Sequence, residues 1–198
     1  AANVYFLSGR NTTPRSVNAN PVRITSGATL TLGNFLNITS ASATAHGGIL
    51  HDNAGGSSTI TGSYIRLSAA NQETVVITGG TSATNTLTID SVITGTNAAT
   101  AGTGQFTKAG NGTLILSGTN LWSGNTNINE GRVQLSGAAA SLGNPRNSNN
   151  LNLRQNTTLD LNAAGAGGAV TVGGINGNGT ITNSGGGSNS PSTLVIGP

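Results

Sequence analysis

Short runs in which aliphatic and polar residues alternate return along this chain every 19 to 27 residues. One column of corresponding aliphatic positions runs through Leu87, Leu114, Val133, Leu159 and Ile181, each beside a Thr or a Gln. Alternation with a period of two is typical of a strand that has one buried and one solvated face. A strand that keeps returning with this spacing predicts a solenoid, because each coil can bury its apolar face only against its neighbours.

We therefore expect an all-β chain that forms a right-handed parallel β-helix. The strands that the alternation predicts end at Gly, Asn or Ser, which tolerate tight turns, and they lie at 28–32, 86–89, 113–116, 126–128, 132–135, 158–161 and 169–172. A β-sandwich also contains many short strands, but it usually has more aromatic core residues than 3% aromatic content supplies. At about 22 residues per coil, residues 1–198 would make about nine coils of a single β-solenoid segment. Only residues 136–142 suggest a turn of helix.

The composition argues against several classes of protein. Charged residues make up 7% of the chain, against about 25% in an ordinary globular domain. The eight Lys and Arg residues are scattered rather than clustered with aromatic residues, so we expect no nucleic-acid partner. The chain has no Cys, which excludes disulfides and Cys-ligated metals. No apolar run approaches the length of about 20 residues that a membrane helix needs, so we expect no membrane insertion by this segment.

One stretch carries a family resemblance. Residues 105–135 read QFTKAGNGTLILSGTNLWSGNTNINEGRVQL, which resembles the passenger-associated repeat of bacterial autotransporters. Nearly every fixed position of that repeat matches, and Asn125 is a slight departure because Gly or a small residue is commoner there. Flanking segments from about residue 86 to 197 look similar to the sequences between such repeats. The resemblance implies an exported bacterial protein with a parallel β-helical passenger, located outside the cell or on the cell surface.

The fixed positions of this repeat are expected to be structural, and they are Lys108, Gly110, Gly112, Leu114, Leu116, Gly118, Asn120, Trp122, Gly124 and Gly131. Trp122 is the only tryptophan of the chain and occupies the aromatic position of the repeat. We expect its ring to cover the coil corner between the strands at 113–116 and 126–128 and to exclude water from the aliphatic stack. Ligand binding by Trp122 is the alternative.

No residue pattern indicates a catalytic, cofactor or metal site. The acids Asp52, Glu73, Asp90, Glu130 and Asp160 are well separated in sequence, whereas glycoside chemistry needs a converging pair of carboxylates. His46, His51 and Asp52 could bind a metal if their loop folded back, but two His residues five positions apart on a strand would point to opposite faces. The Gly-rich stretches 110–112 and 174–179 open no helix, so they do not predict a phosphate loop.

Two further interpretations concern the polar and aromatic residues on the surface of the predicted solenoid. A strip of Thr, Asn and aromatic residues could bind a surface glycan, although Tyr5, Phe6, Tyr64 and Trp122 are far apart in sequence and sugar platforms usually need several rings together. The abundant Asn and Thr residues could also stack in register, as hydrogen-bonded ladders along the coil corners.

The ends of such a rod would expose unpaired strand edges, which need a cap or a neighbour. We therefore expect a segment of a longer protein or a subunit that stacks end to end, so its partners would be flanking repeats of the same chain or copies of itself. Val4, Tyr5, Phe6 and Leu7 are the candidate contact between subunits. The sequence favours a non-enzymatic structural protein, a rigid stalk or filament subunit. An adhesin passenger that binds a glycan or a host protein is the alternative, and a β-helical polysaccharide-degrading enzyme is a third reading.

Overall fold

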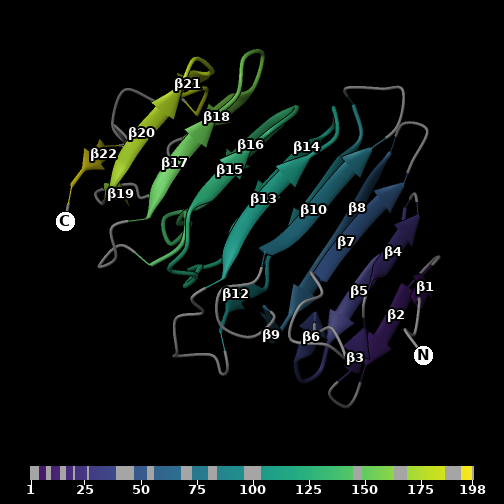
Figure 1. Ribbon diagram of the computed structural model, residues 1–198. Coiled ribbons are helices and arrows are strands. Elements are labelled where there is room, and N and C mark those ends of the chain that lie inside the picture. The colour runs from purple at the N-terminus through teal and green to yellow at the C-terminus, as the bar shows by residue number, and fades with distance from the viewer. Residues whose placement is uncertain are drawn as a thin grey trace.

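The structure is a computed structural model, and it describes residues 5–7, 10–13, 17–19, 21–25, 27–38, 47–52, 56–67, 73–79, 84–95, 104–144, 149–162, 169–185 and 193–197. In these ranges the regular elements are all β-strands, which follow one another along a single stack from the N-terminal to the C-terminal end (Figure 1). Every pair of neighbouring strands is parallel, and each strand pairs with its counterparts in the coils before and after it. The predicted all-β solenoid class is confirmed.

Two sheets of eight strands run the length of the stack. Sheet 1 contains β1 (Tyr5–Leu7), β4 (Val22–Thr25), β7 (Gly47–Asp52), β10 (Glu73–Gly79), β13 (Gln105–Ala109), β15 (Thr126–Ile128), β17 (Asn150–Leu153) and β20 (Gly174–Gly177). Sheet 2 contains β2 (Arg10–Thr13), β5 (Thr29–Leu32), β8 (Ser57–Gly62), β11 (Thr86–Ile89), β14 (Thr113–Leu116), β16 (Arg132–Leu135), β18 (Thr158–Asp160) and β21 (Thr180–Thr182). We number the coils 1 to 8 by their sheet 1 strands, in chain order.

The third side of the stack is less regular. Sheet 3 contains β3 (Val17–Ala19), β6 (Leu36–Ile38), β9 (Tyr64–Arg66) and β12 (Val92–Thr94), which belong to coils 1 to 4. A separate pair, β19 (Ala169–Val172) and β22 (Thr193–Ile196), occupies this side in coils 7 and 8. The described third side of coils 5 and 6 therefore has no strand, and residues 117–125 and 136–144 take its place.

The expected number of about nine coils is wrong, because each long sheet has eight strands. The estimate assumed about 22 residues per coil throughout. Some coils are longer, since Val22 of β4 lies opposite Ile49 of β7, 27 positions on, and Glu73 of β10 lies opposite Gln105 of β13, 32 positions on. A solenoid tolerates insertions of different length between its strands, so a single coil length does not hold for the whole chain.

The register of sheet 2 confirms the aliphatic column seen in the sequence. Leu87 lies opposite Leu114, Leu114 opposite Val133, Val133 opposite Leu159, and Leu159 opposite Ile181. The first four of these side chains are fully buried. Burying one such side chain stabilises a fold by roughly 1.5–3 kcal/mol, so the column contributes to stability at every coil it passes through.

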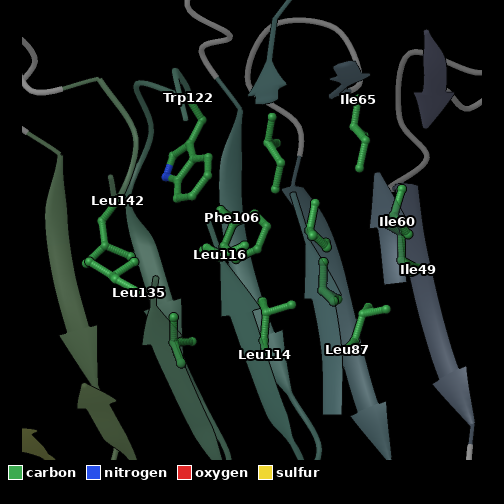
Figure 2. Packing of buried hydrophobic residues seen from close by; sticks show 14 of the residues in the cluster. Ile49, Ile60, Ile65, Leu87, Phe106, Leu114, Leu116, Trp122, Leu135 and Leu142 are labelled. Carbon is green, nitrogen blue, oxygen red and sulfur yellow. The ribbon is translucent and has the colours of Figure 1, made fainter. Parts of the chain in front are cut away.

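The core is a continuous stack of aliphatic side chains inside the three sides (Figure 2). Isoleucine, leucine and valine side chains from successive coils lie above one another, and Phe106 and Trp122 are the large aromatic residues among them. Buried and half-buried residues alternate in β14, where Leu114 and Leu116 are buried while Thr113 and Ile115 are half-buried on the outer face.

The two ends of the described stack differ from its middle. In coil 8, Ile175, Ile181 and Leu194 pack against the core but are only partly buried, and Ile196 is 60% exposed. At the other end, β4 is the one described strand that pairs with β1, so Tyr5, Phe6 and Leu7 lie on the terminal strand of sheet 1. Val4 lies outside the described residues. The role of residues 4–7 as a contact between subunits stays a prediction.

The described residues include no helix long and apolar enough to cross a membrane. Residues 136–142, which suggested a turn of helix, contain no helical residue; they form a tight turn in which the Ala140 amide donates to the Gly137 carbonyl at 3.2 Å.

Candidate functional site

The repeat at 105–135 spans coil 5 and both strands of coil 6, the part of the stack where the described third side has no strand. Backbone hydrogen bonds nevertheless continue along that side. The Leu121 amide donates to the Ile93 carbonyl of coil 4 at 2.8 Å, and the Asn144 amide donates to the Trp122 carbonyl at 2.7 Å. The side chains of the repeat explain how the stack is held together there.

Lys108 joins two coils at the corner after β13. Its side chain is fully buried, and Nζ donates to the carbonyls of Ala109 at 2.9 Å, Gly110 at 2.6 Å and Glu130 at 3.1 Å. The Glu130 carboxylate in turn accepts a hydrogen bond from the Gly110 amide at 2.8 Å. Burial lowers the pKa of Lys108 to about 8, and the nearby charge of Glu130 opposes that effect. The sequence marked Lys108 as a repeat position but gave no sign that this cation is buried.

The glycines of the repeat allow one coil corner to approach the next. Gly131 has a φ of +69°, and a Cβ atom there would lie 2.5 Å from the Gly110 carbonyl oxygen of the preceding coil. Gly110 itself has a φ of +78°, and its Cβ would lie 2.5 Å from the Thr78 oxygen of coil 4. A Cβ atom at Gly112, Gly118 or Gly124 would also lie within 2.8 Å of a backbone oxygen in the preceding coil. These distances are shorter than any real side chain tolerates, so the glycines set the coil spacing.

Asn120 replaces part of the missing ladder on the third side. The side chain is fully buried; Oδ1 accepts a hydrogen bond from the Ile93 amide at 3.0 Å, and Nδ2 donates to the Ser141 carbonyl at 2.9 Å. The Asn120 amide also donates to the Ser141 hydroxyl at 2.8 Å. One side chain therefore connects coils 4, 5 and 6, and a buried amide with its partners satisfied favours a single arrangement of the backbone.

Trp122 fills the interior beside these contacts (Figure 2). Its side chain is fully buried and its ring stacks on Phe106 with centroids 4.4 Å apart and planes inclined by 16°. Nε1 donates to the Thr126 hydroxyl at 2.9 Å, which satisfies the polar atom of the ring. The ring lies wholly inside the core and offers no surface to a ligand.

Asparagines form a ladder, but on a strand face rather than at the corners. On the outer face of sheet 1, the Asn127 amide donates to the Thr107 hydroxyl at 3.1 Å. Asn152 donates to the Asn127 oxygen at 2.7 Å, and Asn176 donates to the Asn152 oxygen at 3.0 Å. The ladder links coils 5 to 8 outside the core.

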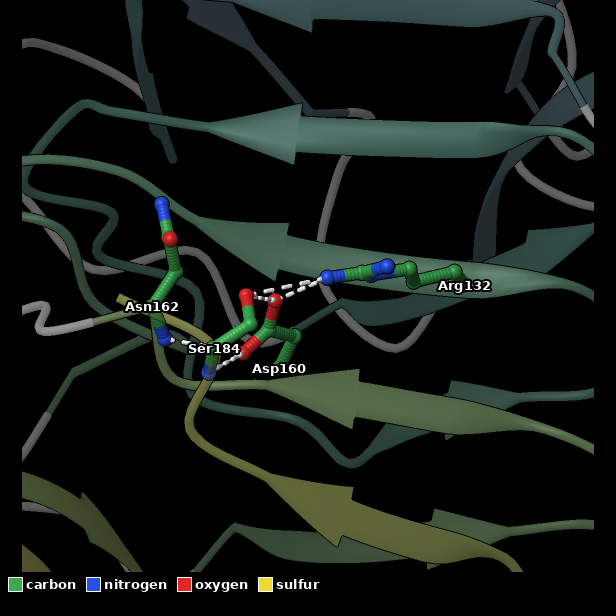
Figure 3. A network of polar contacts seen from close by, with 4 residues as sticks. All are labelled: Arg132, Asp160, Asn162 and Ser184. Atoms are coloured by element: carbon green, nitrogen blue, oxygen red, sulfur yellow. Dashed lines mark hydrogen bonds and ion pairs between the residues drawn. The ribbon is translucent and has the colours of Figure 1, made fainter. Parts of the chain in front are cut away.

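A second polar network secures the last coils (Figure 3). Asp160 is fully buried; its Oδ1 accepts from the amides of Ser184 at 2.8 Å and Asn162 at 3.0 Å, and its Oδ2 pairs with Arg132 and accepts from the Ser184 hydroxyl. Burial raises the pKa of Asp160, but the hydrogen bonds from Ser184, Arg132 and Asn162 together bring it below its ordinary value. The carboxylate therefore binds coil 6 and the segment after β21 in its charged form.

The acids and histidines of the described residues do not gather into a group that could hold a metal ion. Within those ranges no three His, Asp or Glu side chains gather. His51 is fully buried, with Nε2 3.1 Å from the Ser58 hydroxyl, which donates to the Thr25 carbonyl at 2.8 Å. Asp52 faces the other way and pairs with Arg23. His46 lies outside the described residues.

Three residues converge that the sequence did not connect. Phe35 and Tyr64 stack with ring centroids 5.5 Å apart, and the Arg66 guanidinium carbon lies 3.7 Å from the centre of the Phe35 ring. All three side chains are partly exposed on the outer face of sheet 3. The spacing of 29 between Phe35 and Tyr64 is close to one coil, and this was the signal in the sequence that could have paired them.

Comparisons with known proteins agree with the repeat. The model of the passenger-associated-transport-repeat family matches residues 106–135. The chain is also similar to the adhesin BmaC autotransporter of Brucella suis biovar 1 (strain 1330), with 36% identity over 117 residues. That alignment covers 56% of this chain and 3% of the adhesin, so the chain spans a small part of the length of this relative. No solved structure matches the chain.

Proposed function

Because the chain carries the passenger-associated-transport repeat of autotransporter proteins, we propose that it is a rigid, non-enzymatic segment of a passenger displayed outside the cell. The resemblance inferred from residues 105–135 is confirmed, and the extracellular or cell-surface location follows from the repeat and from the similarity to an autotransporter adhesin. The segment acts mechanically: it holds whatever precedes and follows it at a fixed separation and orientation.

The observation that supports a mechanical role is the density of bonds that run between coils. Parallel strands connect each coil to the next in both long sheets. Where the third side lacks a strand, Lys108 and Asn120 add buried hydrogen bonds along the same direction. In a solenoid each coil contacts only its neighbours, so the weakest junction limits the stiffness of the whole. The repeat reinforces the junctions that would otherwise be weakest.

The proposal is tested by pulling the chain between its two ends in a force spectrometer. A stiff segment shows almost no extension until a cooperative rupture, and Asn120→Ala lowers the rupture force because coils 4, 5 and 6 lose a shared connection. Ser136→Ala serves as the control, because Ser136 lies in coil 6 and its half-buried side chain makes no hydrogen bond in the described structure, and it leaves the force unchanged. Gradual extension from the lowest forces, as for a flexible linker, would exclude a mechanical role.

An adhesive role is the second candidate, and the similarity to an adhesin favours it. A stiff scaffold can also carry a binding surface on its outer faces, so the two roles are compatible. We also propose self-assembly through the terminal strands, since β1 pairs with one strand, β4, among the described residues. Mixing two differently labelled preparations of the chain and measuring energy transfer between them tests this role, and absence of transfer at high concentration would exclude it.

A further inference from the structure

The Phe35, Tyr64 and Arg66 side chains form one cluster on the outer face of sheet 3, in coils 2 and 3. Because Leu36 of β6 lies opposite Ile65 of β9, the residues just before them, Phe35 and Tyr64, are neighbours across the sheet. Arg66 lies two residues further along β9, so its side chain emerges on the same face as Tyr64. It folds back over Phe35, and its guanidinium carbon is 5.5 Å from the Tyr64 ring centre.

The charge of Arg66 has no carboxylate partner within the chain. The chain has five acidic residues, all in the described ranges, and each has a partner elsewhere. Asp52 pairs with Arg23, Asp160 with Arg132, Glu73 with Thr107, Asp90 with Ser117 and Glu130 with the Gly110 amide. The one side-chain hydrogen bond of Arg66 in the described structure joins Nη2 to the Tyr64 hydroxyl at 3.3 Å.

The geometry leaves one edge of the guanidinium available. Stacking on Phe35 fixes the plane of the group, and a fixed plane presents its N–H donors in directions that match two oxygens of an anion. Nε is enclosed by the protein, so a ligand would meet the edge formed by Nη1 and Nη2. Beside that edge lie the partly exposed rings of Phe35 and Tyr64. Aromatic surface next to a stacked cation suits a ligand with both an anionic group and C–H faces.

We propose that Phe35, Tyr64 and Arg66 form a binding site for an anionic polysaccharide, with Arg66 binding a carboxylate or sulfate group and the two rings packing against the adjacent sugar. The site goes beyond the mechanical role and does not depend on it, since a stiff segment without this site would behave identically under force. The class of ligand follows from the chemistry of the cluster: a neutral sugar would leave the Arg66 charge unused, and an isolated small anion would leave the rings unused.

The test measures binding of the whole 198-residue chain to three immobilised polysaccharides. Polygalacturonate carries only carboxylates, dextran sulfate carries only sulfates, and dextran is neutral. The proposal expects binding to one or both charged polymers and not to dextran, and the preferred polymer identifies the anionic group. Binding to none of the three, or equal binding to dextran, would overturn it.

Variants separate this site from general attraction to a basic protein. Arg66→Gln and Arg66→Lys are both expected to weaken binding by at least about tenfold, the second because an ammonium ion keeps the charge but loses the planar pair of donors. Arg154→Gln removes one exposed cation in coil 7 and is expected to leave binding within about twofold of the unchanged chain. Equal losses for Arg66→Gln and Arg154→Gln would show non-specific attraction and overturn the proposal. Circular dichroism melting of each variant confirms that it is folded, and Tyr64→Phe gives a second, milder probe of the site.

Discussion

At the scale of single residues, the buried polar and aromatic side chains explain why this repeat uses residues that a purely aliphatic solenoid would not need. Lys108, Asn120 and Trp122 are fully buried, and each donates hydrogen bonds within the chain. A buried polar group without a partner costs roughly 1–3 kcal/mol, so residues of this kind persist only where their partners are fixed. The three side chains thereby specify the arrangement of coils 5 and 6.

Replacing Trp122 by Ala should strongly destabilise the chain. The change removes the stack on Phe106 and the hydrogen bond to Thr126, and a cavity of this size costs about 3–5 kcal/mol. Chemical denaturation followed by circular dichroism measures the loss, because the chain has no other tryptophan to report by fluorescence. Trp122→Phe keeps a ring and should cost less. Unchanged stability together with lost ligand binding would mean that the ring is a binding residue.

His51 should make the stability depend on pH in a defined window. Burial lowers the pKa of His51 below its ordinary value of 6.5, and the charge of Asp52 opposes that effect. The folded chain therefore holds the neutral ring, and below pH 6.5 the unfolded chain takes up a proton first. Stability should fall as the pH drops below this point and level off once the pH passes below the folded pKa.

His51→Gln provides the control for this dependence, because the amide can still bond to Ser58 but does not titrate. The denaturation midpoint of the variant should be flat between pH 7 and 5, whereas that of the unchanged chain declines. If both chains declined in parallel over that range, the decline would have another source.

At the scale of elements, corners and polar networks determine how one coil is placed on the next. Gly131 and Gly27 offer a matched comparison, with φ values of +69° and +70°. A Cβ at Gly131 would meet the Gly110 oxygen at 2.5 Å, whereas nothing lies within 4 Å of a Cβ at Gly27. Alanine at Gly27 should therefore cost only the strain of positive φ, about 1–2 kcal/mol.

Gly131→Ala should cost clearly more than Gly27→Ala, because it adds a clash between coils to the same backbone strain. The difference between the two denaturation midpoints measures the contribution of close stacking. Equal losses would show that Gly131 is needed for its φ alone and that the corner has room to adjust.

Asp160 should control the last coil. Replacing it by Asn removes the charge that pairs with Arg132 and accepts hydrogen bonds from Ser184 and Asn162, at a cost of about 1–3 kcal/mol. The β21 amides should exchange hydrogen about tenfold faster or more, because losing this stabilisation makes local opening of β21 easier by a similar free energy. Asp90→Asn, an exposed acid that contacts Ser117, should leave β21 unaffected. Protection of β21 that survives Asp160→Asn would contradict this role.

The lowered pKa of Asp160 predicts a second loss of stability, at a lower pH than that of His51. Because hydrogen bonds bring the folded pKa of Asp160 below its ordinary value of 3.8, its stabilising contribution is present above that value and is lost as the pH falls through the folded pKa. This window is separate from that of His51, so acid titration of Asp160→Asn should lack the lower transition and keep the upper one.

At the scale of the whole molecule, the sequence predicts local elements well and their arrangement in part. The strands at 86–89, 113–116, 126–128, 132–135 and 169–172 have the predicted bounds, because alternation and glycine breaks are local signals. The column from Leu87 to Ile181 pairs as the spacing predicts. The coil number was predicted wrongly, since a coil of 32 residues and one of 20 leave the same strand pattern.

The side-chain contacts between coils were harder to predict than the strands. Nothing in the sequence distinguishes Lys108 from an exposed cation, because its three acceptors are backbone carbonyls placed by the corner. The cluster of Phe35, Tyr64 and Arg66 depends on the register between β6 and β9, which is set by a connection whose length does not specify pairing. The register between strands decides which side chains of neighbouring coils meet. That register depends on three-dimensional packing, which one sequence alone does not reveal.

The central claim is that the chain is one continuous stack of coils held together along its axis. Electron microscopy of the purified chain tests it most directly. The account predicts straight rods whose averaged images show a regular axial spacing of about 4.8 Å, the distance between hydrogen-bonded strands. Compact particles without this axial spacing, or rods that bend at coils 5 and 6, would contradict it.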